Sequence, residues 1–314
     1  MGAVLGSEII LSIICCTHNR LAFVQKHFEQ LRHELPEQVE LIYALDNCSD
    51  GTQAYLLQQA GGIPNVRVLD YRGPGGLFHC RNHGFEYSNG HYIHYLDDDD
   101  SVEGGYHRQL RTELQDQRLR GIDVYITGMT IELSDGSKTL KAIVAPGLQA
   151  RAQRHGDELH LRGDLLTAVL RGEIYFNCAN AIFSRGFLER HRFRGEFKKS
   201  ADWLLYLEAA LSGDLHLVVN ETLRVNYYIH ELSMSVAPDK SYWNARIFDQ
   251  LLSVTPKASI HRSEIRAACA KANFEAGYAS RRSDKRSAML HYAKAILLGF
   301  VRRPLTGLMK LPLQ

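Results

Sequence analysis

Four consecutive aspartates, Asp97 to Asp100, directly follow the apolar pair Tyr95-Leu96. Adjacent carboxylates repel one another, and a hard divalent cation is the partner that best relieves this repulsion. A cation bound by one or two carboxylates and by substrate phosphates is the usual form of an Mg²⁺ or Mn²⁺ site, and it stabilises a departing diphosphate. The alternative is a solvated acidic loop. The position after an apolar segment favours metal binding, and hence a nucleotide diphosphate leaving group.

Two further carboxylates could take part in such chemistry. Asp202 begins an apolar helical segment after a basic pair, where it either stabilises the helix N-terminus or acts as a base. Asp46 begins a run of polar residues and offers a fixed hydrogen-bond acceptor for a nucleobase or a ribose. The same run is typical of a turn that caps a helix, with Asp50 or Ser49 as the cap. The two interpretations of this run are compatible.

These residues follow segments that alternate as repeated strand-helix-strand units. The expected strands are Ile9–Cys16, Val39–Leu45, Val66–Leu69 and His91–Leu96, and the expected helices are Leu21–Leu35, Thr52–Ala60 and Leu77–Ser88. This alternation predicts an α/β fold with a largely parallel sheet flanked by helices. In such sheets ligands bind beyond the carboxyl ends of the strands. The segments expected there are Thr17–Arg20, Asp46–Thr52, Tyr71–Gly76 and Asp97–Ser101.

The alternation weakens after about Gly128. The segments Met129–Leu133 and Leu140–Val144 flank a turn and predict a hairpin. Further on we expect a helix near Asp164–Arg171, a helix from Asp202, and strands at Ala179–Phe183, Leu215–Val219 and Leu223–His230. Residues 239–300 carry no strand signal and predict two or three helices, one of them within Ser259–Ala279. A helical extension is therefore expected to begin near Val236.

The charge distribution and the cysteines restrict the class of protein. The net charge is +2, but residues 281–314 carry eight Lys and Arg against the single acid Asp284, so this tail is +7 and the rest of the chain is −5. A mildly acidic body argues against a nucleic-acid partner. The six cysteines form no C-x-x-C pair, and no apolar run reaches the roughly 18 residues of a membrane span. We expect a cytoplasmic protein that does not span the membrane.

The order of several motifs resembles the inverting glycosyltransferases of family 2, which have the GT-A fold. The matching segments are Ser12–Arg20, Leu45–Thr52, Gly75–Gly84 with Arg81-Asn82, Asp97–Asp100, Ser200–Trp203 and Tyr227–Ser235. They cover about residues 9–235, so the helical extension lies outside the resemblance. The sequence departs from the family in three places, because Asn47-Cys48 stands where Asp-Gly is frequent, Ala201 replaces an acid, and Tyr228 replaces an arginine.

The resemblance implies a role for individual residues. Thr17, Asn19, Arg20, Asp46, Arg81 and Asp97 would bind the nucleotide sugar, Asp99 and His230 would lie at the metal, and Asp202 would be the catalytic base. The implied cofactor is Mn²⁺ or Mg²⁺. Asp98 occupies the variable position of the motif and is assigned no role. A lone histidine at the end of a strand is most often structural, and this is the alternative for His230.

The expected activity is the transfer, with inversion, of a sugar from a nucleotide diphosphate sugar to a hydroxyl of a glycan or lipid-linked acceptor in surface polysaccharide synthesis. A UDP-sugar is the favoured donor. Residues 1–235 would form the catalytic domain, with its nucleotide-sugar half at about 1–128 and its acceptor half at about 129–235, and residues 236–314 would form the helical extension.

Two other functions are compatible with parts of this sequence. A nucleotidyltransferase that makes nucleotide sugars would usually have a glycine-rich phosphate loop where this chain has Thr17–Arg20. A non-catalytic protein that binds nucleotide sugars or glycans would not need both Asp99 and Asp202. These two features favour the transferase.

The basic tail also has two interpretations. Between Ala288 and Val301 six apolar residues recur at helical spacing, namely Met289, Leu290, Ala293, Ile296, Leu297 and Phe300. A basic amphipathic segment of this kind can lie on the inner face of an anionic membrane as a peripheral contact. Alternatively, its apolar face packs on the catalytic domain or on a second subunit while the cations stay solvated.

Overall fold

The computed structural model describes residues 8–33, 35–231, 233–237 and 239–300, together with residue 304. Within these residues the strands are β1 (Leu11–Thr17), β2 (Val39–Asp46), β3 (Val66–Tyr71), β4 (Tyr92–Tyr95), β5 (Ser101–Val102), β6 (Val124–Leu133), β7 (Lys138–Lys141), β8 (Gln153–His155), β9 (Glu158–Gly163), β10 (Ala181–Ser184) and β11 (Leu215–Ile229). They form one mixed sheet with the order β3-β2-β1-β4-β10-β6-β11-β9-β8, to which β5 is added beside β11 and β7 beside β6.

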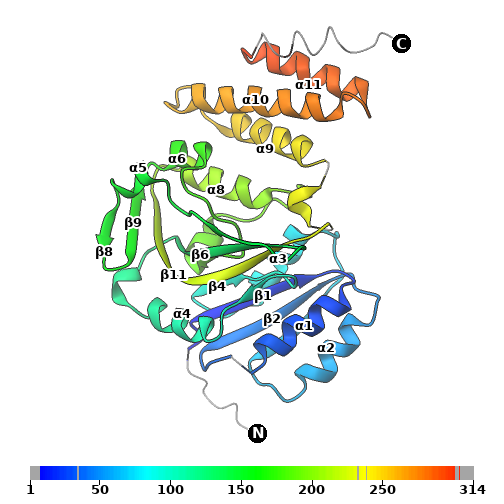
Figure 1. Cartoon of the computed structure of the whole chain (residues 1–314), viewed down its shortest axis with the longest axis vertical. Coiled ribbons are helices and arrows are strands. Elements are labelled where there is room, and N and C mark those ends of the chain that lie inside the picture. Colours follow the sequence, from blue (N-terminus) through cyan, green and yellow to red (C-terminus); the bar gives the residue numbers. More distant parts are fainter. Residues whose placement is uncertain (1–7, 34, 232, 238, 301–303, 305–314) are drawn as a thin grey trace.

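Helices flank this sheet and extend from one end of it. They are α1 (Leu21–Leu31), α2 (Thr52–Ala60), α3 (Leu77–Glu86), α4 (Tyr106–Leu114), α5 (Pro146–Gln149), α6 (Leu166–Arg171), α7 (Arg185–Arg190), α8 (Ala201–Leu211), α9 (Lys240–Val254), α10 (Arg262–Ser280) and α11 (Lys285–Leu297), with short 3-10 helices at Gln117–Leu119 and Met234–Val236. Figure 1 shows the blue N-terminal elements at one end of the molecule and the orange and red helices α9 to α11 stacked at the other.

The N-terminal half is the predicted parallel unit. β1 pairs in parallel with both β2 and β4, and β2 pairs in parallel with β3. Every residue of β1 and β2 is buried, which is the pattern expected of parallel strands that are covered on both faces. Phe28 of α1 and Phe78 of α3 belong to the same hydrophobic core as these strands. The predicted α/β fold class, with its mostly parallel sheet and its C-terminal helices, is confirmed.

One pair of expected strands is in fact a single strand. The segments predicted at Leu215–Val219 and Leu223–His230 both belong to β11, except for His230, which follows the strand, and the pairing of β11 with β6 shifts register between Asn220 and Arg224. The polar residues at this point have the composition of a turn. In the structure Asn220 Oδ1 accepts hydrogen bonds from the backbone N–H and the hydroxyl of Thr222, and this local bond pattern forms a bulge within the strand.

Several boundaries also differ from the sequence expectation, and two of these differences have a local cause. α1 ends at Leu31 and not at Leu35, because Leu35 precedes Pro36 and a residue in that position is disfavoured in a helix. The predicted hairpin is present as β6 and β7, but β7 lies earlier in the chain than the expected segment Leu140–Val144. The turn between them, in which Gly136 N–H donates to the Leu133 carbonyl at 2.9 Å, fixes that register.

The C-terminal helices continue the hydrophobic core of the sheet. Phe248 of α9 packs edge-to-face on Trp203 of α8, with ring centroids 5.0 Å apart. Ile247 and Leu251 of α9 and Ile265 of α10 belong to the same buried cluster as the strands. In the described part of the chain, no helix combines the length and the apolar character needed to cross a bilayer.

Three buried histidines lie on α1, β4 and α4. His27 Nδ1 is 2.8 Å from the Tyr43 hydroxyl, and His94 Nδ1 is 3.3 Å from His107 Nε2. Burial lowers the pKa of His27 and the pKa of His94 to about 4. Burial, together with the charge of a protonated His94, lowers the pKa of His107 well below its usual value. Since an unfolded chain binds these protons with a pKa of about 6.5, folding keeps the rings neutral at mildly acidic pH, where the unfolded chain would be protonated.

We expect the variant His27→Gln to be less sensitive to acid than the wild type. The stability contributed by neutral His27 is complete above about pH 7 and is lost between about pH 6.5 and 4, at up to about 1.4 kcal/mol per pH unit. The raised carboxyl pKa values of Asp98 and Asp100 act in the opposite direction, so the difference between variant and wild type isolates the histidine.

Urea denaturation at about pH 7, 6 and 5 measures this difference. The destabilisation caused by His27→Gln should shrink as the pH falls. The matched control is His33→Gln, because His33 is exposed near the end of the same helix. Parallel curves for His27→Gln and the wild type would contradict the prediction.

Candidate active site

The predicted functional side chains of the N-terminal half follow the carboxyl ends of neighbouring parallel strands. Thr17 is the last residue of β1, Asp46 is the last residue of β2, and the acidic run follows β4, which pairs with β1. β5 continues the acidic run and pairs with β11, where the Tyr228 N–H donates to Asp100 Oδ1 at 3.0 Å. Strand pairing therefore brings segments that are distant in sequence to one edge of the sheet.

Three carboxylates of the acidic run lie close enough together that they could hold a cation. One oxygen from each of Asp97, Asp99 and Asp100 lies within 4.8 Å of the others. Asp100 is buried, and its Oδ2 atom has no hydrogen-bond partner. Burial, together with the charges of Asp97 and Asp99, raises the pKa of the Asp100 carboxyl well above its usual value. A buried oxygen without a donor, beside two more carboxylates, fits a hard cation such as Mg²⁺ or Mn²⁺.

Asp99 and His230, the two residues predicted to lie at the metal, are in contact. His230 Nε2 lies 2.9 Å from Asp99 Oδ2, and Arg20 donates to the same oxygen at 2.8 Å. Burial alone would raise the pKa of Asp99, but Arg20 and His230 outweigh it, and the net pKa lies below the usual value. Asp99 is therefore ionised at neutral pH, as a metal ligand must be.

Asp98, which the motif leaves without a role, connects the acidic run Asp97–Asp100 to the segment Thr17–Arg20 at the end of β1. Thr17 Oγ1 donates to Asp98 Oδ2 at 2.5 Å, and Arg20 lies 2.9 Å from Asp98 Oδ1. Burial raises the pKa of Asp98 to about 7, although Arg20 opposes the shift. Asp98 Oδ2 is thus held by a hydrogen bond from Thr17, whereas Oδ1 has an ion pair with Arg20 but no hydrogen bond, so the structural role of Asp98 is to fix those two side chains. The sequence pattern gave no sign of this role.

A cavity of about 230 Å³ is lined by several of the residues predicted to bind the nucleotide sugar, namely Thr17, Arg20, Asp46 and Asp97, and by Asp99, among others. Asp46 accepts hydrogen bonds from the Gly76 N–H and from the Asn47 side chain, each at 2.8 Å. Asn19, also predicted to bind the nucleotide, accepts from the Ser49 N–H at 2.7 Å and connects the loops after β1 and β2. Its predicted contact with the nucleotide stays a prediction.

Arg81 of α3 is buried against Asp97. One guanidinium nitrogen donates to both oxygens of Asp97, at 2.8 and 3.0 Å, and the guanidinium lies among the rings of Phe78, Tyr95 and Phe193. Burial by itself lowers the pKa of Arg81, but the charge of Asp97 outweighs it and the pKa is raised well above its usual value. Arg81 therefore orients Asp97.

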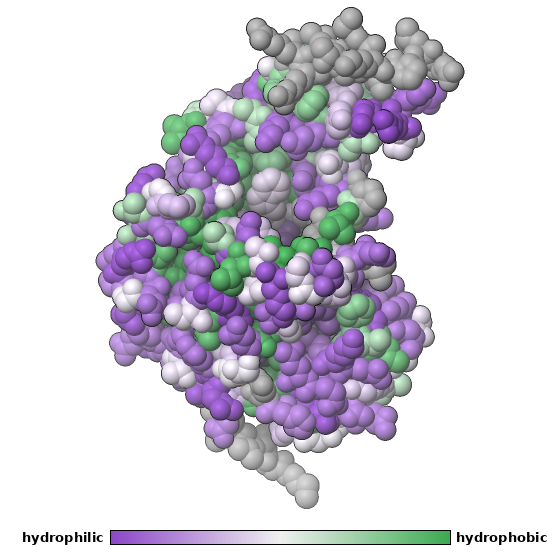
Figure 2. Space-filling view, in the orientation of Figure 1, coloured by the Kyte–Doolittle hydropathy of each residue, from purple (hydrophilic) through white to green (hydrophobic). Residues whose placement is uncertain are grey.

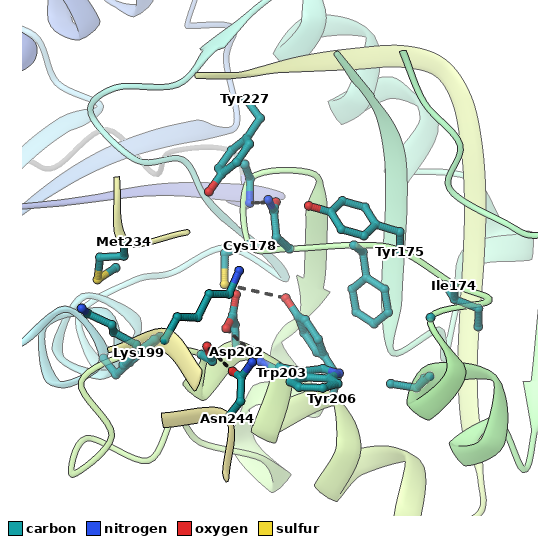
Figure 3. Close-up of a pocket in the computed structure, with 18 of the residues that line it drawn as sticks. Ile174, Tyr175, Cys178, Lys199, Asp202, Trp203, Tyr206, Tyr227, Met234 and Asn244 are labelled. Carbon is teal, nitrogen blue, oxygen red and sulfur yellow. Dashed lines mark hydrogen bonds between the residues drawn. The ribbon is translucent and has the colours of Figure 1, made fainter. Parts of the chain in front are cut away.

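A second cavity, of about 510 Å³, contains Asp202. Its lining includes Asp97 and Tyr227, which also line the first cavity, so the two cavities adjoin. Asp202 is the second residue of α8, and Figure 3 shows it beside Cys178 and Tyr206 among aromatic side chains. The cavity therefore places the predicted base next to the predicted nucleotide-sugar site, although 105 residues separate Asp97 from Asp202 in the sequence.

The helical extension contributes to this second cavity, which the sequence did not indicate. Ser200, which precedes α8 with a φ of 57°, donates its hydroxyl to Asn244 Oδ1 of α9 at 3.1 Å. Lys199 forms an ion pair with Asp239, and Asp239 also accepts from the Trp243 indole at 3.0 Å. The N-terminus of α8, and with it Asp202, is therefore fixed to the N-terminus of α9.

Comparison with known proteins places these features in a family. Residues 12–186 match the family described as "Glycosyl transferase family 2". EpsH of Bacillus subtilis (strain 168) is 24% identical over 196 residues, which cover 61% of this chain and 53% of that protein. The GalNAc(5)-diNAcBac-PP-undecaprenol beta-1,3-glucosyltransferase of Campylobacter jejuni is 25% identical over 191 residues, covering 60% and 55%. The chain thus spans about half the length of these curated relatives.

Solved structures share the fold. Residues 1–349 of S. aureus TarS in complex with UDP-GlcNAc superpose with a TM-score of 0.67 and 15% sequence identity, over 92% of this chain and 81% of that chain. The mannosyltransferase PcManGT of Pyrobaculum calidifontis, in complex with GDP-Man and Mn²⁺, gives a TM-score of 0.53 and 14% identity, over 95% and 83%. These likenesses confirm the predicted fold of the GT-A type.

Proposed function

Because the chain belongs to glycosyl transferase family 2 and is therefore a glycosyltransferase, we propose that it moves one sugar, with inversion, from a nucleotide diphosphate sugar to an acceptor hydroxyl. The single observation that carries this proposal is that Asp97 and Asp202 line the same cavity, next to the cavity that contains Asp46 and Asp99. A donor in the first cavity would present its sugar toward Asp202.

We propose a UDP-sugar as donor and a glycan or lipid-linked acceptor in surface polysaccharide synthesis. The fold neighbour TarS is solved with UDP-GlcNAc, and the C. jejuni relative is named for an undecaprenol diphosphate acceptor. In this chain, Asp46 offers an acceptor to the base or ribose, and its position is fixed by the Gly76 N–H. Thr17 and Arg20 are fixed by Asp98 at the same cavity.

The proposed metal is Mg²⁺ or Mn²⁺, with Asp99 and Asp100 as ligands and His230 beside them. The donor set of carboxylate oxygens, one of them buried without a partner, fits such a cation. When bound, the cation supplies a Lewis acid that stabilises negative charge on the leaving diphosphate. Asp97, which Arg81 orients, would contact the ribose side of the donor.

Asp202 is the proposed general base. Its carboxylate would accept the proton of the acceptor hydroxyl as the hydroxyl oxygen forms a bond to the anomeric carbon and the bond to the diphosphate oxygen breaks. Attack opposite the leaving group inverts the anomeric centre. The aromatic side chains of Tyr175, Trp203 and Tyr206 line the same cavity and would exclude water and contact the faces of sugar rings.

We also propose a division of the chain at about residue 235, with the nucleotide-sugar half at about 1–128, the acceptor half at about 129–235 and the helical extension at 236–314. The support for this division is that the nucleotide cavity is lined largely by residues before 100, whereas the Asp202 cavity is lined largely by residues after 168. Because Lys240 and Asn244 line the latter, the extension would take part in the acceptor site.

We expect Asn244→Ala to lower kcat about tenfold and to leave donor affinity unchanged. Asn244 acts through Ser200 on the N-terminus of α8, so it is a positioning residue for Asp202. Asn244→Asp keeps an acceptor oxygen and should restore most of the rate. Steady-state kinetics separate kcat from KM, and Ser253→Ala, an exposed change on the same helix, is the matched control. Equal rates for Asn244→Ala and wild type would contradict this role.

A direct test of the proposed function combines binding with product analysis. A nucleotide sugar at about 100 times its dissociation constant should stabilise the protein by about 2.7 kcal/mol, so thermal-shift screening of nucleotide sugars with Mn²⁺ identifies the donor. Incubation with an acceptor should then release a nucleoside diphosphate. Pyrophosphate released from a nucleoside triphosphate would show a nucleotidyltransferase, and donor binding without any turnover would show a binding protein.

A further inference from the structure

Among the described residues, helix α11 packs along one face on α10 and forms an ion pair with α9. Its buried residues are Ala288, Tyr292 and Ala295. The two helices approach closely at Gly277 of α10, because a Cβ at that position would lie 2.8 Å from the Tyr292 ring. His291 Nδ1 lies 2.9 Å from Asn273 Oδ1, and Lys294 forms an ion pair with Asp249 at 2.6 Å. These contacts determine which side of α11 faces outward.

The outward side of α11 carries large apolar residues. Met289, Leu290 and Leu297 are 53%, 73% and 77% exposed. Leu290, Ala293 and Leu297 are spaced three and four residues apart and therefore share one face of the helix. The apolar residues singled out from the sequence are thus largely not the ones that pack on the protein. Val301, the last residue of that segment, lies outside the described residues.

Cations flank this apolar face at the start of the helix. Arg282 and Arg286 are exposed, and Lys285 is partly exposed. Figure 2 shows strongly hydrophilic and hydrophobic side chains next to one another in the region of α10 and α11. The sequence from residue 281 to 314 has a net charge of +7 with Asp284 as its single acid. We call Lys285, Arg286, Met289, Leu290, Ala293 and Leu297, together with Arg282 of the turn before the helix, the outer face of α11.

We propose that the outer face of α11 docks the protein on an anionic lipid surface. The apolar side chains would enter the interface between headgroups and acyl chains, and the cations would bind the lipid headgroups. Charge favours a membrane over a second copy of this chain, because two such faces in contact would bring cations together with a single acid from each copy. This inference is independent of the proposed sugar transfer, and its test needs no substrate.

The test is sedimentation of the full chain with vesicles of pure phosphatidylcholine and with vesicles that contain phosphatidylglycerol. The wild type should bind the anionic vesicles, less strongly as salt increases, and should not bind the neutral ones. Leu290→Glu with Leu297→Glu should lower the binding at least tenfold, and Arg282→Glu with Arg286→Glu should do the same. The matched controls are Leu57→Glu on α2, where Leu57 is 56% exposed, and Arg151→Glu in an exposed loop.

Three outcomes would overturn the proposal. The first is wild-type binding that does not depend on anionic lipid. The second is a loss of binding to anionic vesicles that is as large for the control variants as for the α11 variants. The third is a wild-type dimer, measured by light scattering without vesicles, that Leu290→Glu with Leu297→Glu converts to monomer, because a second copy would then cover the outer face. Circular dichroism of each variant verifies that α11 variants remain folded.

Discussion

Replacing Asp202 with asparagine is expected to lower the rate of sugar transfer by a factor on the order of 10² or more, as removal of a general base does. Asparagine preserves the size of the side chain and its position at the start of α8, but it does not accept a proton from the acceptor hydroxyl. Asp202 lines the larger cavity and does not line the cavity that contains Asp46 and Asp99. Donor affinity should therefore be unchanged.

The measurement is single-turnover transfer with saturating donor, together with calorimetric titration of the donor. Glu208→Gln is the matched control, because Glu208 is a carboxylate on the same helix that forms an ion pair with Arg194 at 3.1 Å. This control should retain near wild-type transfer. If Asp202→Asn instead lost donor affinity in proportion to its rate, Asp202 would be a binding or structural residue and not the base.

The second large effect is expected at the acidic loop. Asp99→Asn and Asp100→Asn should each weaken Mn²⁺ binding at least tenfold and remove most of the metal-dependent transfer. Asp99 is ionised beside Arg20 and His230, and Asp100 offers a buried oxygen that has no hydrogen-bond partner. The affinity of a site for a hard cation depends directly on the number of carboxylate oxygens that the site supplies.

Asp98→Asn distinguishes direct binding of the cation by individual carboxylates from an effect of the total negative charge of the acidic run. Thr17 and Arg20 engage both oxygens of Asp98, so this variant should keep most of the Mn²⁺ affinity. Titration of Mn²⁺ by electron paramagnetic resonance on the protein without donor measures binding apart from activity. Wild-type Mn²⁺ affinity in both Asp99→Asn and Asp100→Asn would show that the metal assignment is wrong, and equal losses in all three variants would show a charge effect without specific ligands.

The sequence by itself determined the parallel half of the sheet and the edge at which chemistry is expected. Alternating apolar segments specify strands and helices locally, and the polar residues that directly follow each strand can be recognised in the sequence. Thr17, Asp46 and Asp97 could therefore be assigned to one edge before their contacts were known. The position of each of these three residues follows from where its own strand ends, which is a local property of the sequence and could therefore be predicted.

The sequence was less informative where a run of polar residues is compatible both with a turn between two strands and with a bulge inside one strand. The residues around Asn220 read as a turn between two strands, but the pairing of β11 with β6 continues on both sides of them. Long-range pairing outweighs a local turn preference here, because the irregularity disrupts the ladder only locally and β11 stays paired with β6 on both sides of it. No single-sequence pattern reports a pairing partner that lies about 90 residues away.

Only the tertiary structure decided how the residues of the acidic run differ from one another. In the sequence Asp98 and Asp100 are equivalent neighbours. In the structure Asp98 accepts a hydrogen bond from Thr17 and forms an ion pair with Arg20, whereas the buried Oδ2 of Asp100 has no hydrogen-bond donor and no ion pair among the described residues. The same holds for Asn244, whose contact with Ser200 joins α9 to the helix of Asp202. Burial and hydrogen bonding depend on segments that meet only after folding, so residue type and spacing do not specify them.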